Sequence, residues 1–429
     1  MAALKRSLTL TQLVFYGVGT MVGAGIYSII GVAAGEAGYY LWLSFLCAGV
    51  VAFLTVLSYA ELASMFTKAG AEYQFMKKAF PRWRLLSFMA GYLIALNAAA
   101  TSAAVSLAFS GYLNVFIDVP MLLTAFMLLV ACTAINIAGI RQSTWVSMGL
   151  ICIEVAGLLL VIWAGFQKGD IENSFQDLPS LSNVSGIFTA TALIFFIFIG
   201  FEDVANLSEE THDPEKNIPR ALLISMSITA LMYMLVAVAV IAISTPEDLA
   251  RSDSPLTLAM SNISPWMGQA LAAAALFATA STALISLISI SRLLFGMARE
   301  GDMPRSMSKT LTTRKTPWVA ALVLFGAACL FLPLGEVKII ASISSFGLLL
   351  VFIGVHVALI TLRYREPDLA RGFKVPFAIG RLPVLPLLGI LIAIALLTRF
   401  EAIVYMVGGG AVGCGAFIFF VRKRMQAFS

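Results

Sequence analysis

Residues 17–38 read GVGTMVGAGIYSIIGVAAGEAG, an apolar segment in which seven glycines interrupt an otherwise helical run. Small residues at such spacings are typical of membrane helices that pack closely together. The cluster at residues 23–25 also offers a low-cost place for the backbone to unwind. An interrupted helix presents free N–H groups that favour an anion and free C=O groups that favour a cation. A zwitterionic amino acid needs both, so packing and ligand binding are the two interpretations.

The whole chain is too apolar for a water-soluble protein. Of its 429 residues 60% are hydrophobic and only 12% are charged, whereas soluble domains carry roughly 25% charged residues. Apolar runs of about 20 residues, which span a bilayer as helices, recur throughout, and the alternating short strands of a membrane barrel are missing. We predict an all-α integral membrane protein with twelve transmembrane helices at about 9–34, 40–66, 84–115, 121–139, 144–166, 184–208, 219–244, 266–298, 317–333, 337–362, 383–399 and 401–421.

The connections between these spans alternate in charge. Most lysines and arginines fall in one set, and the opposite set carries only Lys168, Arg251, Lys338 and Arg399. The positive-inside rule then predicts that both termini are cytoplasmic. The formal charge of +5 reflects this basic rim, which suits lipid headgroups rather than nucleic acid. The connections are short, so we expect a single transmembrane domain over residues 1–429.

Cysteine and histidine usage gives no sign of a metal centre, a cofactor or an enzyme. The two histidines, His212 and His356, are far apart in the sequence. The five cysteines lie inside apolar runs without paired spacing, which predicts small core residues rather than disulfides or metal ligands. They are Cys47, Cys132, Cys152, Cys329 and Cys414.

A second unusual segment, FFIFIGFEDVANLSEE, covers residues 195–210. In a straight helix rising 1.5 Å per residue, Glu202 would mark the inner membrane interface. If the helix is instead interrupted around residues 198–201, Glu202 begins a second half-helix inside the membrane. The two candidate helices run in opposite directions across the membrane. Paired interruptions in inverted repeats indicate a transporter site and suit an occluding carrier better than a channel.

Five segments in order along the chain resemble the amino acid–polyamine–organocation superfamily. The run GTMVGAGIY resembles the superfamily's first-helix signature, and residues 200–221 resemble the end of its sixth helix with the following loop. The other three segments are YAELASMFTKAGAEYQFMKKAF (59–80), SRLLFGMAREGDMPRSMSK with the following TPWVA (291–320) and RYREPDLARGFKVP (363–376).

The resemblance implies a LeuT-like fold of two inverted five-helix repeats, at about 9–166 and 184–362, with two extra C-terminal helices at about 383–421. It also implies secondary transport of an amino acid by alternating access across the plasma (inner) membrane. A neutral amino acid is the expected substrate, because no charged side chain of the predicted pocket other than Glu202 awaits a charged one. An antiporter or exporter of amino acids or polyamines is the alternative.

By resemblance, the substrate carboxylate meets the N–H groups of Ala24 and Gly25, and the ammonium meets carbonyls of Val22, Phe198 and Ile199. Phe196 falls at the superfamily's aromatic gate position, although packing against lipid is the alternative for this aromatic-rich run. The implied substrate site comprises Val22, Gly23, Ala24, Gly25, Phe196, Phe198, Ile199 and Gly200.

Glu154 lies near the centre of its predicted span. A charge at mid-bilayer costs on the order of 3 kcal/mol, so such residues usually face the bundle interior and have a function. In proton-coupled members of the superfamily the matching residue is often lysine. We expect Glu154 to carry a coupling proton, with Glu202 as a second candidate. Sodium is the alternative, bound by Glu154 with the hydroxyls of Ser281 and Thr282.

Three further polar residues of the predicted spans have simpler interpretations. Asn97 and His356 are expected to form hydrogen bonds between helices. Glu61 lies near the end of its span and is expected at the membrane interface.

Overall fold

The computed structural model describes residues 8–67, 70–138, 144–175, 181–311 and 316–426. Nearly all of its secondary structure is helical. The helices of the first half are α1 (Leu10–Met21), α2 (Ala24–Ala37), α3 (Leu41–Met65), α4 (Ala71–Ala79), α5 (Arg84–Leu113), α6 (Met121–Ala138), α7 (Thr144–Lys168), α8 (Leu181–Ile194) and α9 (Phe201–Asn206). The second half contains α10 (Pro214–Ile243), α11 (Pro246–Ala250), α12 (Pro255–Ile263), α13 (Pro265–Arg299), α14 (Trp318–Phe331), α15 (Val337–Arg365), β1 (Ala378–Ile379), β2 (Leu382–Pro383), α16 (Val384–Leu397) and α17 (Ala402–Gln426).

The chain is a multi-pass helical membrane protein. Within the described residues, nine helical segments are long and apolar enough to cross a membrane. One of them, Ala24–Met65, joins α2 and α3. Two shorter apolar segments, Trp318–Leu334 and Val384–Leu397, accompany them. Every predicted span overlaps one or more helices, whereas the count of twelve crossings and their arrangement as repeats stay predictions.

Two helices are interrupted where glycines occur. Between α1 and α2, Val22 and Gly23 leave the helical conformation, and Gly23 has φ −57° and ψ −155°. After α8 the chain tightens into a 3₁₀ turn, Phe195–Phe198, and Ile199 is extended. Gly200 then has a φ of 122°, a conformation that glycine adopts without a steric penalty. Both interruptions expected from the sequence are therefore present.

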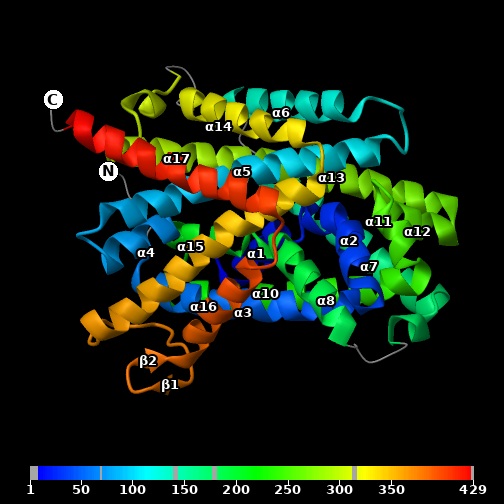
Figure 1. Ribbon diagram of the computed structural model, residues 1–429, viewed down its shortest axis with the longest axis horizontal. Coiled ribbons are helices and arrows are strands. Elements are labelled where there is room, and N and C mark those ends of the chain that lie inside the picture. Colours follow the sequence, from blue (N-terminus) through cyan, green and yellow to red (C-terminus); the bar gives the residue numbers. More distant parts are fainter. Residues whose placement is uncertain (1–7, 68–69, 139–143, 176–180, 312–315, 427–429) are drawn as a thin grey trace.

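The interrupted helices lie at the centre of the bundle. In Figure 1, α1 and α10 occupy the middle of the view, with α3 below them and α5 above, while α6 and α14 form the upper edge. We call one end of the bundle the basic side. It is where α1 and α5 begin and where α13 and α15 end, at Leu10, Arg84, Arg299 and Arg365.

Several short elements were not predicted from the sequence. The helix α4 lies on the basic side, where Asn206 Oδ1 accepts hydrogen bonds from the Gly70 and Ala71 amides at 2.9 and 3.0 Å. The helices α11 and α12 fill the connection between α10 and α13, and each begins with proline. Proline at the first helical position needs no hydrogen-bond acceptor for its nitrogen, so this signal was available in the sequence. The strands β1 and β2 form a small antiparallel hairpin.

Glu61, expected at the membrane interface, is buried within the bundle near the end of α3. Its side chain has no exposed surface, and its carboxylate pairs with both Arg363 and Arg371. The Val375 amide also donates to Glu61 Oε2 at 2.7 Å. The arginines come from about 300 residues further along the chain, so the sequence around Glu61 gave no sign of them. This buried cluster fixes the connection between α15 and α16 to α3.

The other intramembrane polar residues behave as expected, but two cysteines do not. His356 Nδ1 lies 2.7 Å from Ser58 Oγ, which joins α15 to α3. Asn97 accepts a hydrogen bond from Ser344, which joins α5 to α15. All five cysteines are free, but Cys152 and Cys414 are exposed on the bundle surface. These two are therefore outward-facing residues of apolar helices and not core residues.

Candidate functional site

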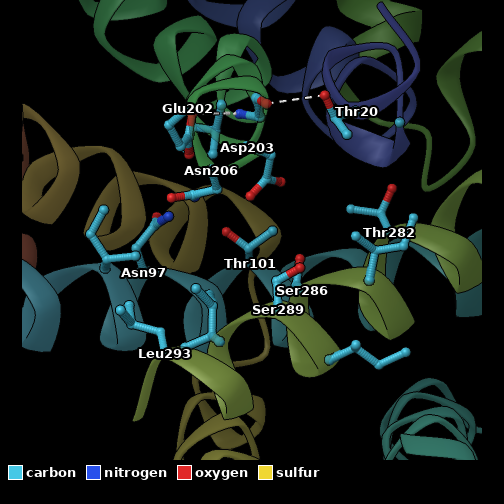
Figure 2. A pocket seen from close by; sticks show the side chains of 18 of the residues that line it. Thr20, Asn97, Thr101, Glu202, Asp203, Asn206, Thr282, Ser286, Ser289 and Leu293 are labelled. Carbon is cyan, nitrogen blue, oxygen red and sulfur yellow. Dashed lines mark hydrogen bonds between the residues drawn. The ribbon is translucent and has the colours of Figure 1, made fainter. Parts of the chain in front are cut away.

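The two interrupted helices contact each other at their breaks. The Thr20 hydroxyl donates to the Gly200 carbonyl at 3.0 Å, and Figure 2 shows this bond between α1 and the start of α9. A Cβ atom on Gly200 would lie only 2.6 Å from the Thr20 carbonyl oxygen. Glycine is thus required at position 200 both by its φ and by the approach of α1.

A cavity of about 620 Å³ lies beside these breaks. It extends to the basic side, because Tyr73, Glu210 and Glu300 also line it. Two residues of the predicted site, Val22 and Phe198, are buried and do not line the cavity. The predicted residues that do line it are Gly23, Ala24, Gly25, Glu154, Phe196, Ile199, Gly200, Glu202, Ser281 and Thr282.

The α2 end of the first break presents backbone amides to the cavity. The first amides of a helix have no acceptor within that helix. The Ala24 amide donates to Thr282 Oγ1 at 2.9 Å, which leaves the Gly25 amide as the next donor of this first turn. A Cβ on Gly23 would lie 2.4 Å from Thr282 Oγ1, so glycine lets α13 approach the break. At the α1 end, the Tyr233 hydroxyl donates a hydrogen bond to the Met21 carbonyl.

Glu154 of α7 faces the cavity from the same side as α13. Its carboxylate oxygen Oε1 accepts a hydrogen bond from Ser281 Oγ at 2.8 Å, and its backbone carbonyl accepts one from Tyr27 at 3.0 Å. The residue is 2% exposed. The structure therefore brings Glu154 together with Ser281 and leaves it without a cationic partner among the described residues.

A second group of carboxylates lines the cavity toward the basic side. Glu202 Oε2 accepts the Gly200 amide at 2.9 Å, so this side chain caps the break itself. Asp203 follows on α9, and Glu72 projects from α4. Glu72 is buried and accepts a hydrogen bond from the Tyr59 hydroxyl at 2.8 Å. Burial raises the pKa of Glu72 to about 7, and the nearby charge of Asp203 acts in the same direction.

Aromatic residues of the 3₁₀ turn point in different directions. Phe196 lines the cavity and is 3% exposed. Phe195 packs against Phe352, and Phe198 packs against Tyr233, with ring centroids 5.7 and 5.4 Å apart. Packing of Phe196 against lipid is therefore excluded for this structure.

The far wall of the cavity is polar and comes from α5 and α13. In Figure 2, Asn97 and Thr101 lie on the α5 side, and Ser286 and Ser289 lie on α13. Thr101 Oγ1 is 3.3 Å from Ser344 Oγ, the hydroxyl that also bonds Asn97. Sequence reasoning treated Asn97 only as an interhelical contact and did not assign it to the cavity.

Three residues that organise the site were not predicted. Thr20 joins the two breaks, Tyr233 holds the end of α1, and Asn206 connects α9 to α4. Thr20 and Asn206 lie close to the glycine-rich segments in sequence and were recognisable as polar residues in apolar runs. Tyr233 lies in an ordinary apolar helix, and nothing local marks it.

A multi-pass helical bundle with a central cavity at two interrupted helices has the architecture of a secondary transporter. The comparison with known families gives the particular class. The amino acid permease family model matches residues 8–421, and the chain belongs to this family. It is therefore a membrane transporter of the amino acid–polyamine–organocation superfamily and not an enzyme.

Several curated relatives are similar over most of their length. The chain is 30% identical to the branched-chain amino acid permease BcaP of Bacillus subtilis, over 92% of this chain and 88% of the relative. It is 26% identical to the methylthioribose transporter of the same organism, over 99% and 95%. It is also 27% identical to cationic amino acid transporter 1 of Arabidopsis thaliana, over 84% of this chain and 63% of the relative.

Proposed function

We propose that this permease carries a neutral amino acid across the plasma membrane by alternating access, with the substrate bound at the two helix breaks. The observation that carries the proposal is the Thr20–Gly200 hydrogen bond beside the cavity. It brings the non-helical backbone of both breaks, with the Gly25 amide on one side and the extended Ile199 on the other, to one place. Such groups bind the carboxylate and ammonium of an amino acid without any charged side chain.

The carboxylate would bind at the first turn of α2, at the amides of Ala24 and Gly25. Because Thr282 accepts the Ala24 amide in this structure, the carboxylate would share or displace that hydroxyl. Val22 and Gly23 form the unwound turn, and the carbonyl of Ile199, which lines the cavity, would accept the ammonium. The carbonyls of Val22 and Phe198, two residues that do not line the cavity, would join it only after a movement of the breaks. Phe196 would close over the bound substrate, a role that its position on the cavity wall supports.

Coupling to a proton is the second part of the proposal. Glu154 is buried, faces the cavity and has one hydroxyl donor, Ser281. A carboxyl group in such a setting can take up and release a proton between the two access states, and Glu202 at the second break is placed to respond to it. Sodium is the alternative ion, with oxygens of Glu154, Ser281 and Thr282 as ligands.

The remaining architecture of the proposal follows the superfamily. The twelve spans would form inverted repeats at about 9–166 and 184–362, with α16 and α17 outside them. The basic side would face the cytoplasm with both termini, as the charge distribution indicates. Because the cavity reaches that side, the structure would represent an inward-facing state.

The similarity to a branched-chain amino acid permease supports an apolar neutral substrate. A cationic substrate is the second candidate, and a specific observation favours it. The cavity lining includes the carboxylates of Glu72, Glu202 and Asp203, and some relatives are named cationic amino acid transporters. These carboxylates lie on the basic side of the breaks. There they would attract the long cationic side chain of a substrate bound at the breaks, or contact a substrate that has left them.

Direct binding to the purified protein in detergent separates these candidates. Leucine should raise the thermal unfolding temperature, while arginine and putrescine should not. Phe196→Ala should weaken the leucine response, and Phe126→Ala on the exposed surface of α6 should leave it unchanged. If arginine or putrescine raises the unfolding temperature and leucine does not, the substrate is cationic and the proposal of a neutral substrate is wrong.

A further inference from the structure

A cluster of arginines lies at one corner of the basic side, and none of them lines the cavity. It comprises Arg84 at the start of α5, Arg305 in the connection after α13, and Arg422 near the end of α17, around the buried carboxylate of Asp302. We call these four residues the arginine corner. The C-terminal part of α17 and the connection after α13 meet here, since Arg422 donates to the Gly301 carbonyl.

Both oxygens of Asp302, the single carboxylate of the arginine corner, already have partners. Asp302 Oδ1 pairs with Arg84 at 3.0 Å, and Oδ2 accepts the Tyr73 hydroxyl at 2.7 Å. Arg305 and Arg422 form no ion pair among the described residues. Arg84 and Arg305 are close enough to Arg422 to repel its charge. The corner therefore carries two positive charges in excess of its own negative charge.

Two further features indicate an anionic group at the arginine corner. The Nη1 atom of Arg422 is buried and has no hydrogen-bond acceptor within the described part of the chain. The first turn of α5 also begins here, and Trp83 provides it with no side-chain cap. Free amides at a helix N-terminus favour a phosphate or another anion, so they add to the charge of the arginines.

The location identifies the source of the anion. Arg84 begins one apolar span and Arg422 lies near the end of another, so the corner is level with a membrane boundary. Trp83 is 66% exposed beside Arg84, and tryptophan is enriched at the level of lipid headgroups. Guanidinium groups bind phosphate oxygens in bidentate fashion. We propose that the arginine corner binds the phosphate of an anionic phospholipid, with its acyl chains running along α5 and α17.

Native mass spectrometry of the delipidated protein tests this site with phosphatidylglycerol and phosphatidylcholine as probes. The test variant is Arg305→Gln with Arg422→Gln, and the matched control is Lys216→Gln with Arg220→Gln at another exposed part of the same side. Each basic residue near a headgroup contributes about fivefold in affinity. The test variant should therefore bind phosphatidylglycerol about thirtyfold more weakly, while the control and the wild type bind alike.

Four readouts keep the result interpretable. Both variants should elute like the wild type. Arg305, Lys216 and Arg220 are exposed, whereas Arg422 is partly buried and bonds the Gly301 carbonyl. The single variant Arg305→Gln, which should bind phosphatidylglycerol about fivefold more weakly, therefore separates loss of charge from loss of that contact. Arg305→Lys with Arg422→Lys should retain most of the binding, because it keeps the charge. Phosphatidylglycerol should stay bound in excess inorganic phosphate. Equal losses in the test and control variants, equal binding of phosphatidylcholine, or displacement by inorganic phosphate would each overturn the proposal.

Discussion

The hydroxyl of Thr20 donates a hydrogen bond of 3.0 Å to the carbonyl of Gly200. These residues are 180 positions apart, yet each lies at the point where its helix is interrupted. The bond therefore holds one break against the other and sets the width of the space between them. Movement of either half-helix during transport would have to stretch or break it.

Gly200→Ala should damage both folding and transport. The backbone at this position has a φ of 122°, and a Cβ would lie 2.6 Å from the Thr20 carbonyl. Strain of this kind costs on the order of 1–3 kcal/mol. We expect a lower thermal unfolding temperature in detergent and little substrate binding. Gly326→Ala is the control, because a Cβ there meets nothing within 4 Å inside α14. Equal stability of the two variants would contradict the account of the break.

Glu154→Gln should uncouple transport from the pH gradient. The variant keeps the hydrogen bond to Ser281 but has no proton to exchange. In proteoliposomes, a pH gradient should no longer drive accumulation, so the substrate should only equilibrate, while exchange of internal for external substrate continues. Glu247→Gln, which changes an exposed carboxylate of α11, is the matched control. Unchanged accumulation in Glu154→Gln would return this residue to a packing role, and accumulation driven by sodium at constant pH would identify sodium as the ion.

Asn206→Ala should loosen α4 without unfolding the bundle. The Asn206 side chain accepts the amides of Gly70 and Ala71, which precede and begin that helix. Loss of a helix cap costs about 1 kcal/mol, which corresponds to about fivefold faster amide exchange. Hydrogen–deuterium exchange of residues 71–79 measures this change. Asn217→Ala serves as the control, because the Asn217 side chain, in the first turn of α10, donates to the His212 carbonyl of another connection. Identical exchange in both variants would show that α4 does not depend on α9.

Glu72 should make stability depend on pH. Burial raises the pKa of Glu72 from 4.5 to about 7 in the folded protein, so the folded state holds this proton to higher pH than the unfolded state does. This difference in proton binding adds up to about 3 kcal/mol to the free energy of unfolding. The addition is complete below about pH 4.5 and is lost as pH rises through 7.

We therefore expect the wild-type unfolding temperature to fall more steeply between pH 5 and pH 8, as an approximate interval around that pKa, than that of Glu72→Gln. Glu215→Gln, which changes an exposed carboxyl group, should retain the wild-type slope. Parallel curves for the wild type and Glu72→Gln would rule out a buried, protonated Glu72.

Hydropathy predicted the long helices well because each must hide about 20 apolar residues from water. The glycine cluster at residues 23–25 predicted the first interruption because glycine lets the backbone unwind at low cost, whereas the second interruption was expected from the resemblance to the superfamily. The short helices α4, α11 and α12 were missed, since none of them is an apolar run of membrane length. The helices α11 and α12 begin at prolines, and the start of α4 is capped by the side chain of Asn206, which is remote in sequence.

The site was only partly accessible from the sequence for a similar reason. Glu154 and Ser281 were paired in advance as candidate ion ligands, and they lie within hydrogen-bond distance. The partners of Glu61 and the role of Tyr233 depend on contacts between segments more than 200 residues apart. Local patterns carry no information about such contacts, because they arise only when the bundle is packed.

Substrate counterflow tests the central claim most directly. Proteoliposomes loaded with unlabelled leucine are diluted into radiolabelled leucine without any ion gradient, beside vesicles that contain the Gly200→Ala variant. Binding of a neutral amino acid at the two breaks predicts transient accumulation of label with the wild type and none with the variant. Accumulation that requires arginine or a polyamine in the vesicles, or equal accumulation with the variant, would contradict it.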